Sequence, residues 1–145
     1  MMESAFGRPA LTCPFYGPMM VGVGIVVKRI YDEPESGDGY RILVDRLWPR
    51  GVSKERAALD LWMKGIAPSP ELRKWFGHEP TRFNEFAEQY RAELDANDEA
   101  VTALHDLAAA HATVTLLYAA KDPLVNHAVV LRDYMNDIIG AVETR

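Results

Sequence analysis

The chain has 145 residues, of which 48% are hydrophobic and 26% charged, a length and balance typical of one folded soluble domain and not of a disordered chain. Its formal net charge of -5 argues against general nucleic-acid binding, which needs excess Lys and Arg to displace counterions from phosphates, so no nucleic-acid partner is expected. The single cysteine, Cys13, excludes an intramolecular disulfide and a cysteine-based zinc cluster, and a reducing cytoplasm is the expected compartment.

The N-terminal residues 1–24 are predicted to be a flexible leader, and residues 25–140 to form a single α/β domain. Gly and Pro interrupt the apolar run at 15–27, and no basic cluster precedes it. The run is also too short to span a bilayer as a helix. We therefore expect neither a signal peptide nor a membrane anchor.

The first part of the domain is predicted to be rich in strands. Residues 25–31 are β-branched and followed by a turn-rich segment, which indicates a strand, and 40–47 form a second. The short gap between these two strands favours their pairing as a hairpin. Ser53 is placed to cap a helical turn over 54–58, and the alternating segment 59–64 is typical of a third strand.

The later elements are predicted to alternate between helices and one strand. Ser69 and Gly77 mark the start and stop of a short helix, and Pro80 opens a longer one. Asn97 is expected to cap the next helix. Residues 113–118 lack alternation, as in a strand that is covered on both faces. This order predicts an α/β layered domain with a small, mainly parallel central sheet flanked by helices, Rossmann-like or flavodoxin-like in outline.

Two predicted strands end in polar and aromatic side chains that suit a binding site. The candidate ligand-binding residues are Asp45, Arg46, Trp48 and Arg50 after the second strand, and Lys121 and Asn126 after the last one. Open α/β sheets bind ligands at the carboxyl ends of their strands, and the last helix, beginning near Asn126, would point its free N–H groups at the same place. We therefore expect a small phosphate- or carboxylate-bearing ligand there.

Catalysis at this site, if it occurs, would use acid–base chemistry, with His127 or Asp122 moving a proton. Phosphate-binding glycine loops, zinc-protease motifs and serine-hydrolase elbows are absent from the sequence. No metal site is predicted, and the sequence does not identify a cofactor. His78, after the Gly77 stop, either joins the site or caps the end of its helix.

Each candidate also has a structural explanation. Asp45 and Arg46 can pair with each other, and the tryptophans can be core residues. A second functional hypothesis is a non-enzymatic protein–protein interaction module, in which aromatic and basic side chains form a docking surface. A ligand pocket should enclose Arg46 and Lys121 together, whereas a docking surface should leave Trp48 and Trp75 contiguous and open.

Three motifs resemble one known family. They are VDRLWPRGVSK at 44–54, LWMKGIAPSPELRKWFGHEP at 61–80 and TLLYAAKDPLVNHAVVL at 115–131. In this order they are similar to the domain of unknown function 488 family (DUF488), in its short YeaO-like branch, over residues 27–135. The resemblance implies a small bacterial α/β protein of unestablished function.

The chain departs from longer members of that family in the last motif. In those members the loop after the last strand carries a cysteine pattern, which resembles sites that use a thiolate beside a helix N-terminus. Here the matching positions are Tyr118, Ala119 and Ala120, followed by Asn126, His127 and Ala128. Because no thiol is present at these positions, thiol transfer and cysteine phosphatase chemistry are disfavoured.

Overall fold

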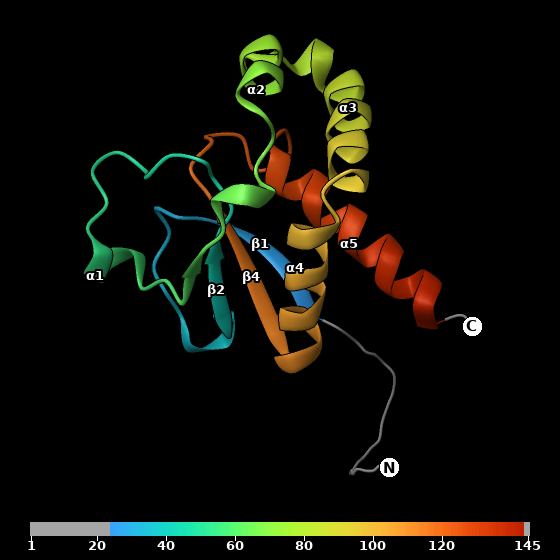
Figure 1. Cartoon of the computed structure of the whole chain (residues 1–145). Coiled ribbons are helices and arrows are strands. Elements are labelled where there is room, and N and C mark those ends of the chain that lie inside the picture. The colour runs from blue at the N-terminus through green and yellow to red at the C-terminus, as the bar shows by residue number, and fades with distance from the viewer. Residues whose placement is uncertain (1–23, 144–145) are drawn as a thin grey trace.

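The computed structural model describes residues 24–143 and contains a four-stranded sheet in the order β1-β4-β2-β3 (Figure 1). The strands are β1 (Gly24–Arg29), β2 (Tyr40–Leu43), β3 (Leu61–Trp62) and β4 (Thr113–Tyr118). Every pairing is parallel, which confirms the predicted α/β class with a parallel sheet. The predicted leader lies outside the described residues, apart from Gly24, which begins β1.

The expected hairpin between the first two strands is wrong. Strand β4 lies between β1 and β2, and all three run in the same direction. Residues 30–39, which include a 3-10 turn at Ser36–Asp38, carry the chain back to the amino edge of the sheet. A gap of this length allows either an antiparallel hairpin or a connection back to the start of a parallel strand. The chain takes the second course, because β4 is buried between β1 and β2.

The first predicted strand ends at Arg29 instead of residue 31, and the next two are much shorter than expected. The β2 ladder ends soon after Leu43, because the Asp45 carboxylate, and not its backbone, receives the N–H of Ala119, the residue just after β4. Only Leu61 and Trp62 of the predicted third strand pair with β2.

Most helices agree with the punctuation in the sequence. The helices are α1 (Lys54–Ala57), α2 (Pro70–Phe76), α3 (Phe83–Asp95), α4 (Asp98–Ala110) and α5 (His127–Glu143). Asn97, however, does not cap α4 with its side chain, which donates to the carbonyl of Gly65 instead, and Pro80 opens a 3-10 turn that precedes α3. The hydroxyl of Ser69 accepts the N–H of Leu72 at the start of α2, and Gly77 ends that helix at a φ of 53°. Asn126 caps α5 by accepting the N–H of Val129. No helix within residues 24–143 is both long and apolar enough to cross a membrane.

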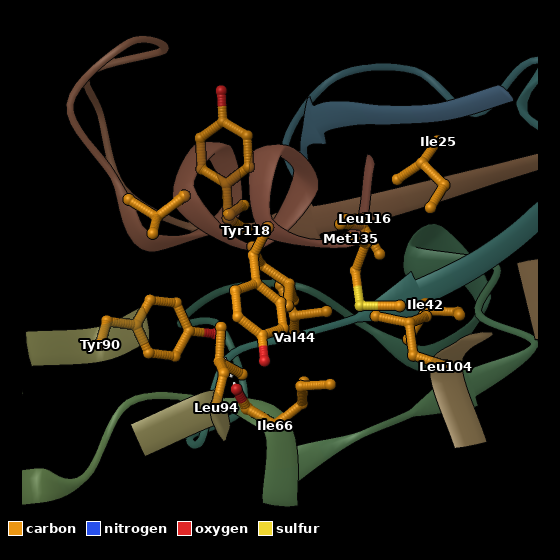
Figure 2. Close-up of a cluster of buried hydrophobic side chains, with 14 of the residues drawn as sticks. Ile25, Ile42, Val44, Ile66, Tyr90, Leu94, Leu104, Leu116, Tyr118 and Met135 are labelled. Carbon is orange, nitrogen blue, oxygen red and sulfur yellow. Dashed lines mark hydrogen bonds between the residues drawn. The ribbon is translucent and has the colours of Figure 1, made fainter. Parts of the chain in front are cut away.

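Two hydrophobic clusters cover the two faces of the sheet. Helices α2–α5 pack on one face, where the larger cluster includes Ile42, Tyr90, Leu116 and Met135 (Figure 2). The smaller cluster on the other face contains Leu117 with residues from the segment that leads through α1, which lies apart from the other helices in Figure 1. Leu116 and Leu117 are both fully buried, which confirms that β4 is covered on both sides.

The parallel sheet also fixes the position of the candidate site. Since all strands run in one direction, the segments that follow β1, β2 and β4 leave the sheet at the same edge. The polar residues after β2 and β4 are thereby brought together from positions about seventy residues apart, as the hydrogen bond from Ala119 to Asp45 shows.

Candidate functional site

A pocket of about 320 Å³ lies at the carboxyl edge of the sheet. It is formed by the segments after β1, β2 and β4, together with α2 and the start of α5. Its polar and charged side chains are Tyr31, Asp45, Arg46, Arg50, Arg73, His78 and His127. The pocket therefore contains three arginines, two histidines and one carboxylate.

Asp45 joins the ends of the two central strands. Its Oδ2 accepts the backbone N–H of Ala119 at 3.0 Å, and its own carbonyl accepts the indole N–H of Trp62 at 2.8 Å. Its Oδ1 is buried and has no aligned hydrogen-bond donor among residues 24–143. One oxygen of the carboxylate is thus structural, and the other makes no aligned hydrogen bond within residues 24–143, although it lies 3.1 Å from Nε2 of His127.

His127 begins α5 and lies beside this carboxylate. Its Nε2 is 3.1 Å from the carbonyl oxygen of Val44 and 3.1 Å from Oδ1 of Asp45. Both neighbours are acceptors, so Nε2 carries a hydrogen, and that N–H is aligned with Val44. The ring packs edge-on against Tyr90 at 6.3 Å, which leaves the side chain only 16% exposed.

Tyr90 is buried and packs against the ring of His127. Burial raises the pKa of its hydroxyl well above the ordinary value, and the negative charges of Glu93 and Asp45 raise it further. The neutral hydroxyl donates to the carbonyl of Ile66 at 2.7 Å, within the cluster drawn in Figure 2. Tyr90 is therefore a structural donor and not a proton source.

Arg46 is one of the three arginines that line the pocket. Its Nη2 makes long contacts with the carbonyls of Ala67 (3.4 Å) and Pro68 (3.3 Å). Its Nε is buried and has no partner among the described residues. A guanidinium has five N–H donors, so several remain for a ligand.

Arg73 and His78 complete the pocket from the side of α2, and Arg73 was not among the residues predicted from the sequence. It lies on an exposed helix surface where charged residues are ordinary, so only the tertiary fold brings it to the site. His78, which the sequence left open, lines the pocket at a φ of 58° with its ring 5.8 Å from that of Phe76.

Glu93 of α3 holds the start of α2 in place. Its carboxylate accepts both the backbone N–H of Ser69, at 2.9 Å, and the Ser69 hydroxyl, at 2.6 Å. The helix that carries Arg73 therefore depends on a contact with a residue 24 positions away.

We expect Glu93→Ala to lower the free energy of unfolding by about 2 kcal/mol, because two hydrogen bonds to a charged acceptor are lost. Urea denaturation measures this loss. Glu88→Ala, an exposed acid on the same helix, is the matched control and should change stability by less than about 0.5 kcal/mol. Equal effects of the two substitutions would show that the Ser69 contact contributes nothing.

Three of the predicted residues lie outside the main pocket. Lys121 and Asp122 are exposed and line a neighbouring hollow of about 400 Å³, which shares His78, Ala119 and Ala120 with the pocket. Oδ1 of Asp122 accepts the N–H groups of Leu124 and Val125, and so shapes the loop. Asn126 is buried and occupied in capping α5.

The tryptophans lie in two separate parts of the molecule: Trp48 and Trp62 together, and Trp75 elsewhere. Trp48 is half-buried, donates its N–H to the carbonyl of Val52 at 2.6 Å and packs edge-on against Trp62 at 5.3 Å. Trp75 lies on α2 with the guanidinium of Arg82 5.4 Å from its ring. No aromatic contact joins Trp48 to Trp75 in the part of the chain that the structure describes.

The acidic and histidine side chains do not form a metal centre in the described range. Within residues 24–143, no group of three or more His, Cys, Asp or Glu is arranged to hold a metal ion. What the pocket offers chemically is a set of cationic side chains, from Arg46, Arg50 and Arg73.

Comparison with known proteins identifies a family and several relatives of this chain. The family model described as "Inactive DUF488-N3 subclade" matches residues 24–144. The uncharacterized protein YeaO of Escherichia coli K12 is 49% identical over 116 residues, which cover 80% of this chain and 100% of YeaO. Uncharacterized proteins of Mycobacterium bovis and Mycobacterium tuberculosis are each 40% identical over 110 residues, 76% of this chain and 92% of theirs. No solved structure gives a significant match.

Proposed function

The chain belongs to the family described as the inactive DUF488-N3 subclade, and from that membership and the pocket we propose that it binds a small anionic ligand without chemical turnover. The ligand is a phosphate- or carboxylate-bearing molecule held at the carboxyl edge of the sheet by Arg46, Arg50 and Arg73.

The observation that carries this proposal is the concentration of cationic side chains in one pocket of an acidic protein. The formal net charge is -5, yet three arginines from two separate segments line a single cavity with only one carboxylate among them. Guanidinium groups bind phosphates and carboxylates through paired hydrogen bonds. Arginines that serve only to keep the protein surface hydrated have no reason to cluster in one pocket.

The absence of turnover is supported by how the candidate proton-transfer groups are used. Nε2–H of His127 is committed to the carbonyl of Val44, and Oδ1 of Asp122 is occupied by two backbone N–H groups. The two residues line different hollows. The thiol expected of longer relatives is also replaced, and the printed description of the family is "inactive".

Arg46→Ala is the variant that tests the proposal. Wild type and variant are titrated calorimetrically with a panel of phosphorylated and carboxylated metabolites, and we expect the variant to bind at least about tenfold more weakly, because buried guanidinium donors are lost. Arg132→Ala removes the same charge from α5, outside the pocket, and should keep wild-type affinity. The ligand should be recovered unchanged after prolonged incubation.

Two results would contradict the proposal. One is that no member of the panel binds the wild type. The other is that binding occurs with equal affinity in the Arg46 and Arg132 variants. Lys121→Ala, in the neighbouring hollow, should have a smaller effect than Arg46→Ala, because Lys121 is exposed and lies outside the pocket.

The docking-surface alternative has weaker support. Trp48 is packed in the smaller core cluster and its N–H is already bonded, so it is not a free aromatic anchor. A cytoplasmic location and the lack of a nucleic-acid partner remain predictions from composition.

A further inference from the structure

We propose that the pocket and the neighbouring hollow form one two-part site, whose ligand is a phosphate ester with an uncharged body that carries hydroxyl groups. The pocket holds the phosphate, the hollow holds part of the body, and His78 contacts the body where the two cavities meet. The inference rests on the proposed function and narrows its ligand class from small anions to esters of this kind.

The two cavities adjoin along three shared residues. His78, Ala119 and Ala120 line both of them. The alanine side chains are short, so His78 has the only polar side chain on this shared wall. The pocket has a volume of about 320 Å³ and the hollow about 400 Å³, which is far more than a bare phosphate fills. A ligand that begins in the pocket and extends over the shared wall therefore passes His78.

His78 is free and accessible at this junction. The residue is exposed, and its ring lies 5.8 Å from that of Phe76. The hydrogen bonds and ion pairs of histidines within residues 24–143 involve His105 and His127, and not His78. The ring nitrogens of His78 are therefore open to a ligand. Because an uncharged imidazole has one donor and one acceptor, it can bond hydroxyl groups, which have both.

The charges of the two cavities differ, and this difference orients the ligand. Three arginines and one carboxylate line the pocket, and Arg50 and Arg73 are exposed, so that a ligand can reach them. Lys121 and Asp122 line the hollow, and both are exposed. Their opposite charges leave little net attraction for a second anionic group. The anionic group therefore binds in the pocket, and the uncharged body extends into the hollow.

Asp122 adds an acceptor for the body. Its Oδ1 accepts the N–H groups of Leu124 and Val125, whereas Oδ2 accepts no hydrogen bond from the described residues. Since Asp122 is exposed, a hydroxyl group in the hollow can donate to Oδ2. Lys121 offers N–H donors in the same hollow. The hollow is thus suited to a body with several hydroxyl groups rather than to an apolar one.

Three probes test the ligand class on the wild-type protein. Inorganic phosphate supplies the anionic group alone, fructose 6-phosphate adds an uncharged body with hydroxyl groups, and fructose 1,6-bisphosphate adds a second phosphate to the same body. Each is titrated at constant pH and ionic strength, with binding followed by NMR chemical shifts. We expect fructose 6-phosphate to bind at least about tenfold more tightly than phosphate. The bisphosphate should exceed fructose 6-phosphate by no more than about threefold, since the hollow gives the second phosphate little net attraction.

His78→Gly assigns the contact to this residue. Position 78 has a φ of 58°, which glycine adopts readily, so the variant loses the side chain without strain. We expect the advantage of fructose 6-phosphate over phosphate to fall by at least about threefold. Ala58→Gly is the matched control, because Ala58 has a φ of 49° and lies outside both cavities. The control should keep the wild-type advantage.

Asp122→Asn tests the charge balance of the hollow. The amide oxygen can still accept the N–H groups of Leu124 and Val125, while Lys121 loses the opposite charge beside it. We expect the bisphosphate to gain at least about threefold relative to fructose 6-phosphate. No gain would overturn the orientation of the ligand by charge.

The outcomes separate this inference from the proposed function. If phosphate and fructose 6-phosphate bind the wild type equally, the body is not contacted and the inference is wrong, while anion binding stands. A wild-type preference of more than about tenfold for the bisphosphate would also overturn it, because the hollow would then be a second anion site. An equal advantage of fructose 6-phosphate in His78→Gly and Ala58→Gly removes the role of His78. If no probe binds, the inference fails, and the carboxylates of the wider panel decide whether the proposed function fails with it.

Discussion

Gly39→Ala is expected to lower the free energy of unfolding by more than about 3 kcal/mol, the largest effect that we predict. A β-carbon at this position would lie 2.3 Å from the carbonyl oxygen of Thr113 on β4. The backbone there has a φ of 67° and a ψ of -130°, a combination that residues with a β-carbon rarely adopt. Neither β4 nor the return segment can shift without disturbing the central ladder.

Gly37→Ala is the matched control, two residues away in the same return segment. A β-carbon at Gly37 would meet no atom within 4 Å. We expect a change of less than about 0.5 kcal/mol. Urea denaturation of both variants measures the contrast, and similar stabilities would show that the close approach of Gly39 to β4 is not maintained in solution.

Asp38→Asn is expected to cost about 3 kcal/mol at neutral pH, because it leaves a buried cation without its counter-charge. Asp38 accepts hydrogen bonds from Arg41 and Lys28, and its carbonyl accepts the hydroxyl of buried Thr115 at 2.6 Å. Arg41 is 4% exposed, and its other donors reach the carbonyls of Ala57 and Ala58. This network joins the return segment to β2 and α1.

The same substitution should change how stability depends on pH. Burial alone would raise the pKa of Asp38, but hydrogen bonds from the Glu35 backbone, Lys28 and Arg41 lower it below the ordinary value. A carboxyl with a depressed folded-state pKa contributes stability above its unfolded pKa of about 3.9, and loses it as pH falls through the folded value. The wild type should therefore lose stability below about pH 4 more steeply than Asp38→Asn.

Burial alone would lower the pKa of Lys28, because it disfavours the charged ammonium. Hydrogen bonds to Glu35 and Asp38 outweigh this effect and raise the pKa above the ordinary value. Lys28 therefore keeps its charge throughout this acidic range. Denaturation at a series of pH values provides the measurement. Glu33→Gln, which removes an exposed acid paired with Arg56, is the control and should follow the wild-type curve. Parallel acid profiles of wild type and Asp38→Asn would contradict the role of Asp38.

The helices were predictable because their signals are local. Ser69, Gly77 and Asn126 act within a few residues of themselves, through a hydroxyl or amide that accepts a nearby N–H or through a left-handed turn. Such contacts do not depend on what the rest of the chain does. The burial of β4 on both faces was equally visible, as an apolar run without alternation.

Strand pairing was not predictable in the same way. The ten residues between β1 and β2 allow a hairpin or a return, and only the insertion of β4, about seventy residues later, selects the parallel arrangement. The end of β2 likewise depends on the hydrogen bond that the N–H of Ala119 donates to the Asp45 carboxylate. Both features are contacts between distant segments, whose partners the local sequence does not name.

The sequence by itself determined the family, through the resemblance of its three motifs to known members. It also determined the α/β class, most helix boundaries and the gathering of Asp45, Arg46, Arg50 and His127 after two strands, since these follow from residue type and short-range spacing. Tertiary structure alone decided the strand order, the entry of Arg73 into the pocket, the use of Asn126 as a cap and the lack, within residues 24–143, of an aligned hydrogen bond at one Asp45 oxygen. The physical reason is that which polar atoms find partners depends on the packing of segments far apart in the chain.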